Sequence, residues 1–208
     1  MTFPTVAILN YGSGNIQSIS QALKNLGISS LIISDPSSYL CSDFTHIILP
    51  GVGKFDSCRQ QLDSSGLFPL LVDTYSSGSV PILGICIGMH LLASSSEEGS
   101  LSGLNFIPGK VQHFSNIGAS PCPHMGWNSV TYLESNNPLD LPSNSYYYFI
   151  HSFYYCPSDE STVMGISHYN SDFCSVISSD QVFGVQFHPE KSHHFGLSLL
   201  QSFSNFKC

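Results

Sequence analysis

The sequence has few charged residues and almost no arginine. Only 10% of its 208 residues are charged, against about 25% in an average globular domain, and Arg59 is the single arginine. Lysine and arginine together number 6, whereas aspartate and glutamate number 14, so the formal net charge is −8 at pH 7. Because binding to phosphates requires basic groups, we expect neither nucleic-acid binding nor attraction to an anionic membrane surface.

Membrane-spanning and secretory signals are also missing. No apolar run approaches the roughly 18 residues that a membrane span requires. The first nine residues contain no basic segment, and their apolar stretch is too short for a signal peptide. No Asn-x-Ser/Thr sequon is present. We therefore expect a cytoplasmic protein.

Paired cysteines are absent, although the sequence has 7 cysteines. Their number is odd and none forms a CxxC pair, so we expect neither a disulfide framework nor a zinc site. His193 and His194 follow His188 closely, but no cysteine or carboxylate stands at ligand spacing from them. We expect no metal and no cofactor.

Hydrophobic residues make up 42% of the chain and aromatic residues 12%, which is enough for a packed core. In the first half, apolar strands alternate with helices, a pattern typical of a parallel sheet with crossover helices. In the second half, short strands follow one another and favour antiparallel hairpins. We predict a single α/β domain over residues 1–208, with a central, mostly parallel sheet flanked by helices and an antiparallel extension. The predicted strands are 5–9, 30–33, 46–49, 80–85, 126–133, 146–155, 163–169, 173–178 and 182–187, and the predicted helices cover 15–26, 56–76, a segment from residue 89, and 195–206.

The sharpest local motif is Gly84-Ile85-Cys86-Ile87-Gly88, in which a strand ends, the chain turns sharply and a helix begins. This is the G-x-C-x-G form of a nucleophile elbow, which exposes its central side chain at the carboxyl edge of the sheet. The positive end of the following helix favours the thiolate of Cys86. A buried structural cysteine in a strand-to-helix turn is the alternative interpretation.

A candidate base follows the last strand, in the segment Phe187-His188-Pro189-Glu190. A nucleophilic cysteine requires a base, and the base requires a group that orients it. Alternate residues of an extended chain lie on the same face, so Glu190 can hold His188. Triad members need not be close in sequence. Alone, the segment is also compatible with a surface strand end.

Oxyanion donors are predicted from two places. The backbone N–H of Ile87 provides one donor, and the glycine-rich segment Pro50-Gly51-Val52-Gly53 provides another from Val52 or Gly53. An ordinary turn is the alternative for this segment.

With these motifs the chain resembles the class I, or triad, glutamine amidotransferases, whose fold is flavodoxin-like. Gly-Ile-Cys-Ile-Gly-Met at 84–89 and Gln-Phe-His-Pro-Glu at 186–190 carry this likeness. Within that class it is similar to the glutaminase subunit of imidazole glycerol phosphate synthase, the HisH family. Three further segments carry that likeness, 10–15 (NYGSGN), 123–128 (PHMGWN) and 147–153 (YYFIHSF).

The resemblance implies an activity. Cys86 attacks the side-chain amide of L-glutamine, His188 transfers the proton and Glu190 orients His188; a γ-glutamyl thioester forms, ammonia leaves and water releases glutamate. Ammonia then passes to a (βα)8-barrel cyclase subunit, which makes imidazole glycerol phosphate and an aminoimidazole carboxamide ribonucleotide in histidine biosynthesis. A heterodimer with that subunit is implied.

The resemblance also implies roles for further residues. In the family the Pro-Gly-Val-Gly segment completes the oxyanion hole, often only once the partner is engaged. The implied glutamine-binding positions are Glu98, His151, Ser152 and Phe153, and the implied partner-interface positions are Asn15, Trp127 and Lys191. The chain departs from the family at His90, where glutamine is common at a substrate-binding position, and at Gln17 and Gln21, where an arginine is usual.

Three alternatives remain open from the sequence. Related glutaminase subunits serve synthases of surface-sugar biosynthesis, and the sequence hardly separates them from the leading interpretation. A catalytically silent regulatory subunit is disfavoured by the intact triad residues. A thiol protease of similar fold would leave the three subfamily segments unexplained.

Overall fold

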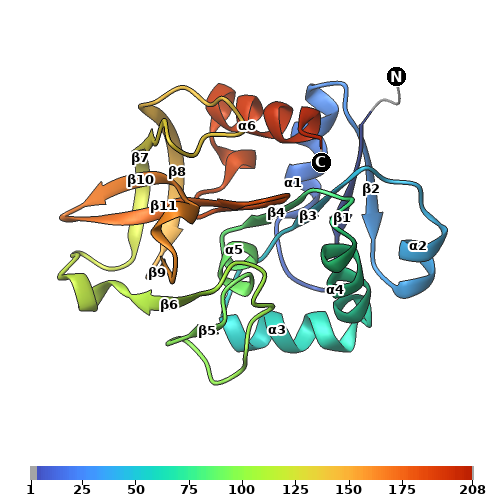
Figure 1. Ribbon diagram of the computed structural model, residues 1–208, viewed down its shortest axis with the longest axis horizontal. Coiled ribbons are helices and arrows are strands. Elements are labelled where there is room, and N and C mark those ends of the chain that lie inside the picture. The colour runs from blue at the N-terminus through green and yellow to red at the C-terminus, as the bar shows by residue number, and fades with distance from the viewer. Residues whose placement is uncertain (1–3, 208) are drawn as a thin grey trace.

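The computed structural model describes residues 4–207, whose strands form a 12-stranded mixed sheet with helices on both faces (Figure 1). The main strand order is β2-β1-β3-β4-β12-β11-β10-β7-β8, and β5, β6 and β9 pair beside it. The α/β class predicted from the sequence is confirmed, with a parallel core and an antiparallel extension.

The parallel half comprises β2 (Ser29–Ile33), β1 (Thr5–Leu9), β3 (His46–Leu49), β4 (Ile82–Ile85) and β12 (Val182–Val185). Strands β3, β4 and β12 are buried along their whole length, as expected when helices cover both faces of a parallel sheet. In Figure 1, α1 (Ile16–Asn25) and α6 (His193–Asn205) lie above the sheet, and α3 (Phe55–Ser64), α4 (Leu67–Ser77) and α5 (Ile87–Leu91) lie below it. A short helix, α2 (Pro36–Cys41), follows β2.

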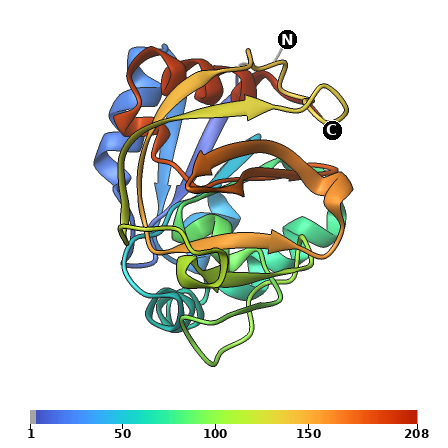
Figure 2. The ribbon, with the colours of Figure 1, turned by 90° about the vertical axis from the view of Figure 1, so that its left-hand side faces the viewer.

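The antiparallel half carries the second part of the chain (Figure 2). Strands β11 (Ser171–Ser179) and β10 (Val163–Tyr169) continue the sheet from β12, followed by β7 (His124–Tyr132) and β8 (Ser145–His151). Strand β9 (Phe153–Pro157) pairs with β11 and with β6 (Gly109–His113), which in turn pairs with β5 (Ser95–Ser96). Three 3₁₀ turns complete the elements: η1 (Phe114–Ile117), η2 (Glu160–Thr162) and η3 (Pro189–Lys191).

Two predicted elements are each divided in the structure. The helix expected over 56–76 is broken at Gly66, whose left-handed φ of 73° ends α3 and lets α4 begin in a new direction. The strand expected over 146–155 is broken at Ser152, so that β8 and β9 pair with different strands. Short elements α2, β5 and β6 were not predicted. None of the helices in residues 4–207 is both long and apolar enough to cross a lipid bilayer.

One edge of the sheet collects the ends of four parallel strands. Strands β1, β3, β4 and β12 run in the same direction and are neighbours in the order β1-β3-β4-β12. The segments that follow them therefore meet at the carboxyl edge, where ligands bind in open α/β sheets. They contain Ser13, Val52, Cys86 and His188, respectively.

Candidate active site

Cys86 lies at a strained turn that two glycines make possible. It joins β4 to α5 with a φ of 56°, a backbone conformation that a non-glycine residue rarely adopts. A Cβ on Gly84 would come within 2.6 Å of the Gly88 carbonyl oxygen, and one on Gly88 within 1.8 Å of the Leu49 oxygen. The G-x-C-x-G pattern is therefore required by packing of the elbow against itself and against β3.

A cavity of about 350 Å³ opens at Cys86. It is lined by residues that follow β3, β4 and β12 and by residues at the end of β8. Its lining is Val52, Gly53, Cys86, Ile87, His90, Pro123, Ile150, His151, Ser152, His188 and Lys191. The cavity thus brings together nine of the residues singled out from the sequence, and it leaves Gly51, Glu98, Phe153, Asn15, Trp127 and Glu190 outside its lining.

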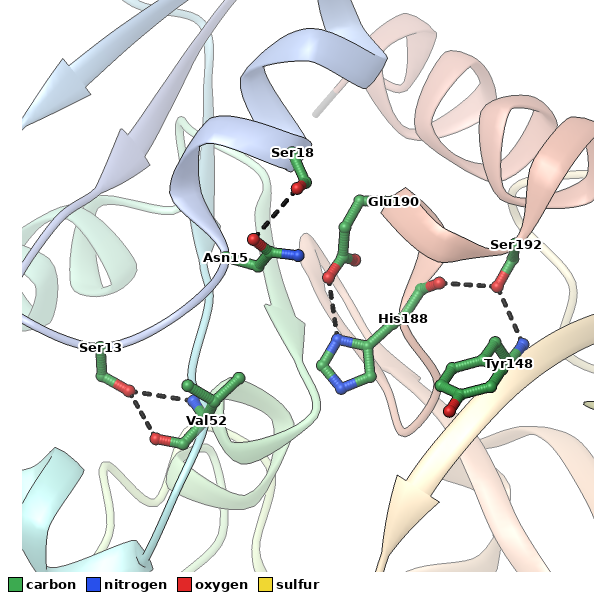
Figure 3. Close-up of polar contacts among 8 residues, drawn as sticks. All are labelled: Ser13, Asn15, Ser18, Val52, Tyr148, His188, Glu190 and Ser192. Carbon is green, nitrogen blue, oxygen red and sulfur yellow. Dashed lines mark hydrogen bonds and ion pairs between the residues drawn. The ribbon is translucent and has the colours of Figure 1, made fainter. Parts of the chain in front are cut away.

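His188, in the cavity lining, forms a buried pair with Glu190 (Figure 3). The His188 Nδ1 atom lies 2.9 Å from Glu190 Oε1, and the two side chains are 3% and 0% exposed. Burial lowers the pKa of His188, but hydrogen bonding and charge from Cys86 and Glu190 outweigh it and raise the pKa above its usual value. This arrangement is that of a nucleophile, a base and an orienting carboxylate.

Sequence reasoning missed the residue that anchors His188. The Ser192 hydroxyl donates to the His188 carbonyl oxygen at 2.6 Å and accepts from the Tyr148 N–H at 3.0 Å (Figure 3). The His188 N–H donates to the Tyr148 carbonyl oxygen at 2.9 Å. The base is therefore held between β8 and the start of α6. The only signal for this was the position of Ser192 four residues after the histidine.

The amide of Val52 is held by Ser13 (Figure 3). The Val52 N–H donates to Ser13 Oγ at 2.9 Å, and that hydroxyl donates to the Val52 carbonyl oxygen at 2.8 Å. Cys58 Sγ also lies 3.3 Å from the same carbonyl. Both backbone groups of Val52 are therefore engaged by Ser13, and its N–H is not free to donate to an oxyanion at Cys86. By contrast, Ile87 is the first residue of α5, so its N–H has no acceptor carbonyl one turn earlier in the helix and is available as a donor.

His90 lies fully buried in the cavity lining beside Gln186. Its Nε2 atom is 2.8 Å from Gln186 Oε1. Within residues 4–207, His90 Nδ1 and Gln186 Nε2 are buried without a hydrogen-bond partner. Burial lowers the pKa of His90 to about 4, against the opposing effect of the Gln186 hydrogen bond. His90 is therefore neutral near pH 7 and presents an unused polar atom.

The residues expected to bind glutamine differ in their surroundings. The imidazole of His151 is buried between His124 Nδ1, at 2.9 Å, and the Phe153 carbonyl oxygen, at 2.7 Å. The ring of Phe153 packs edge-on against His113, at 5.0 Å between ring centroids. Glu98 accepts the N–H of Phe55 at 3.0 Å. Gly51 packs against the elbow, where an added Cβ would lie 2.9 Å from the Gly88 nitrogen.

Exposed apolar side chains lie along the β7–β8 hairpin, and two exposed apolar residues, Ile150 and Val52, also line the cavity. Trp127 is 49% exposed and its ring stacks on His193 with centroids 5.0 Å apart. Met125 and Ile150 are directly opposite each other in the hairpin, and Val52 and Ile150 belong to both the surface and the cavity. We call Val52, Met125, Trp127, Tyr146 and Ile150 the rim patch; all are exposed large hydrophobic side chains.

Asn15 and Lys191 lie near Glu190. Asn15 precedes α1, accepts the Ser18 hydroxyl at 3.0 Å and is drawn beside Glu190 in Figure 3. The ammonium of Lys191 lies over the Tyr148 ring, 5.7 Å from its centroid. No group of three or more His, Cys, Asp or Glu side chains in the described part of the chain is arranged to hold a metal ion.

Comparison with known proteins agrees with this geometry. The model of the family "Glutamine amidotransferase class-I" matches residues 7–204. The imidazole glycerol phosphate synthase subunit HisH 2 of Methanococcus maripaludis is 44% identical over 199 residues, covering 95% of this chain and 98% of the relative. The HisH subunits of Leptospira interrogans and Archaeoglobus fulgidus are each 41% identical over 96% of this chain, covering 99% and 98% of their own lengths.

Solved structures share the fold at lower identity. A crystal structure of a glutamine amidotransferase superposes with a TM-score of 0.73 at 17% identity, covering 95% of this chain and 98% of the other. A GMP synthase component from Thermoplasma acidophilum gives a TM-score of 0.71 at 20% identity, covering 98% and 94%. These two likenesses concern the fold alone.

Proposed function

Because the chain belongs to the class I glutamine amidotransferases and, within them, to the HisH subunits of imidazole glycerol phosphate synthase, we propose that it hydrolyses L-glutamine and passes ammonia to a cyclase subunit. The cyclase is a (βα)8 barrel that makes imidazole glycerol phosphate and an aminoimidazole carboxamide ribonucleotide. The observation that carries this proposal is the placement of Cys86 with the buried His188–Glu190 pair at one cavity. The chain acts as a single amidotransferase domain in the cytoplasm.

The chemistry begins with Cys86 as nucleophile. The proton of the thiol passes to His188, and the sulfur attacks the carboxamide carbon to give a tetrahedral oxyanion. His188 then donates the proton to the departing nitrogen, so ammonia leaves and a γ-glutamyl thioester remains. Water, deprotonated by His188, releases glutamate and restores the thiol. Glu190 fixes the orientation of His188 through Nδ1 and stabilises its charged form.

The oxyanion requires donors, and one of them is engaged elsewhere. Ile87 supplies one N–H at the start of α5. The second donor would be the Val52 N–H, after the backbone on both sides of Val52 turns away from Ser13 and directs this N–H toward Cys86. The hydrogen bonds of Ser13 therefore hold a resting state, and docking of the cyclase at the neighbouring rim patch releases it.

Glutamine occupies the 350 Å³ cavity with its carboxamide at Cys86. His90, His151 and Ser152 line the space that the amino-acid moiety fills. We assign Glu98 to the α-ammonium group, beside the cavity. Phe153 contributes through its carbonyl, which orients His151.

The cyclase subunit docks on the rim patch. The patch consists of five exposed apolar side chains, two of which line the cavity, and such a composition is that of the centre of a protein interface. Lys191 is the cation in the cavity lining, and we assign Asn15, which precedes α1, to the same interface. The interface therefore depends on apolar contact more than on ion pairs, in agreement with the low content of lysine and arginine.

The test is glutamate release from L-glutamine by the purified chain alone, with a HisF-type cyclase subunit, and with that subunit plus its ribonucleotide ligand. Strong stimulation in the complete mixture supports glutamine hydrolysis and partner control together. Absence of turnover by folded protein in every mixture would refute the proposal. Stimulation by a synthase of surface-sugar biosynthesis instead would show that this synthase, and not the cyclase, receives the ammonia.

A further inference from the structure

The segment 97–102, which we call the Glu98 loop, is fastened to the first turn of α3. Glu98 Oε2 accepts the N–H of Phe55, the first residue of α3, at 3.0 Å. In return, Asp56 accepts the N–H of Ser100 at 2.9 Å and that of Leu101 at 3.1 Å. The Ser100 hydroxyl adds a bond to Asp56 Oδ2 at 3.2 Å. A carboxylate of the loop thus accepts a backbone N–H of α3, and a carboxylate of α3 accepts backbone N–H groups of the loop.

The contact between the loop and α3 is close and extends along the helix. A Cβ on Gly99 would lie 1.9 Å from Asp56 Oδ1, so the loop backbone rests directly on the carboxylate. Further along α3, Arg59 Nε donates to the Ser102 carbonyl oxygen at 3.1 Å. Arg59, the only arginine of the chain, therefore makes a second contact between α3 and the loop.

Glu98 keeps one oxygen free. Its Oε2 atom accepts the N–H of Phe55, and no hydrogen bond within residues 4–207 uses Oε1. The side chain is half-buried, and burial raises its pKa, whereas the Phe55 N–H and Lys54 lower it and Asp56 raises it further. Phe55, whose N–H Glu98 accepts, follows the Pro50–Gly53 segment by two residues. The free oxygen therefore belongs to a carboxylate beside the oxyanion segment.

We propose that Asp56 is a positioning residue for glutamine recognition: by holding the backbone of Ser100 and Leu101, it fixes Glu98 so that Oε1 receives the α-ammonium group of the substrate. The inference rests on the proposed function, because it concerns the same substrate. A carboxylate accepts all of these donors at once, whereas the amide of Asn would direct its own N–H groups at one or more of them. Substitution Asp56→Asn should therefore loosen the loop without removing side-chain volume.

The experiment measures alkylation of Cys86 in the purified chain by two reagents. The first is the chloroketone analogue of glutamine, 2-amino-5-chloro-4-oxopentanoate, which retains the α-ammonium; the Cys86 sulfur bonds to its C5 carbon and chloride leaves. The second is iodoacetamide, which lacks the α-ammonium and loses iodide. The variants are Asp56→Asn and Asp56→Ala, and the matched control is Asp73→Asn, an exposed carboxylate on α4 with no hydrogen bond to the loop.

The expected result is a rise of about tenfold in the half-saturating chloroketone concentration for the Asp56 variants, the scale of one lost charged hydrogen bond. The limiting alkylation rate and the iodoacetamide rate should stay at the wild-type values. Glu98→Gln should give a similar rise, and the double variant Glu98→Gln/Asp56→Asn should lose little more than either alone because both act on one contact.

Three outcomes would overturn the inference. An unchanged half-saturating concentration in both Asp56 variants removes Asp56 from recognition. Equal slowing with both reagents, accompanied by a lower melting temperature, means that Asp56 only supports the fold. Full additivity with Glu98→Gln means that the two residues act separately. Failure of the wild-type chain itself to prefer the L over the D chloroketone would refute the proposed glutaminase function as well.

Discussion

Substitution Ser13→Ala tests whether the Val52 peptide is held in a resting orientation. The change removes the acceptor of the Val52 N–H and the donor to the Val52 carbonyl, at 2.9 and 2.8 Å. It leaves Cys58 as the remaining side-chain contact of that carbonyl, at 3.3 Å. We expect the variant to release the peptide and so to raise glutamine hydrolysis in the absence of a partner.

The magnitude follows from the two lost hydrogen bonds. Each neutral hydrogen bond contributes about 0.5–1.5 kcal/mol net, so the resting orientation loses about 1–3 kcal/mol. That loss shifts the population toward the turned peptide by roughly 5- to 150-fold. If this turn limits hydrolysis by the isolated chain, partner-free kcat rises by the same factor. The rate with the cyclase and its ribonucleotide ligand present should not change, because there the peptide is already turned.

The assay is glutamate release by wild type, Ser13→Ala and the control Ser20→Ala, each with and without the partner. Ser20 loses a comparable hydroxyl, which lies 3.1 Å from the Ser30 hydroxyl and makes no hydrogen bond to Val52. Circular dichroism melting checks that each variant is folded. Partner-free activity of Ser13→Ala equal to that of Ser20→Ala would refute the reasoning. So would an equal rise with and without the partner, because that would place the effect outside the resting state.

Three further predictions concern the triad and the buried histidine. Cys86→Ala should abolish glutamate release while the melting temperature stays near that of wild type; residual turnover at the wild-type rate would exclude Cys86 as nucleophile. Glu190→Gln should lower the pKa of His188, because Glu190 raises it, and should reduce kcat about 100-fold or more; an NMR titration of His188 and the partner-stimulated assay check both. His90 has a pKa of about 4 in the folded protein, below its value of about 6.5 in the unfolded chain. Between these two pH values the unfolded state binds more protons, so the free energy of unfolding decreases as the pH falls from 6.5 toward 4. Between pH 7 and pH 5, the wild type should lose about 2 kcal/mol more free energy of unfolding than His90→Gln, as measured by urea unfolding. An equal loss in wild type and variant would contradict this prediction.

Element boundaries show where sequence reasoning reached its limit. The alternation of strands and helices correctly predicted the parallel half, because buried parallel strands are continuous apolar runs. The single helix expected over 56–76 was wrong because an isolated glycine within a helical pattern can either be tolerated or adopt left-handed φ, as Gly66 does. The break at Ser152 was also missed, since apolar alternation continues through it and only the pairing of β8 and β9 with different strands divides them.

The sequence by itself determined the family and contains the motifs from which the chemistry is predicted. A nucleophile elbow requires glycines on both sides of its cysteine, and a base followed two residues later by a carboxylate is a local pattern, so Cys86, His188 and Glu190 can be read without the fold. Only the tertiary structure decided which distant groups hold these motifs. Ser13 contacts Val52 across 39 residues, His90 contacts Gln186 across 96, and Asp56 supports the Glu98 loop across 44. These pairs depend on the order in which β1, β3, β4 and β12 lie in the sheet and on where α3 packs, and neither spacing nor residue type in one sequence specifies that order.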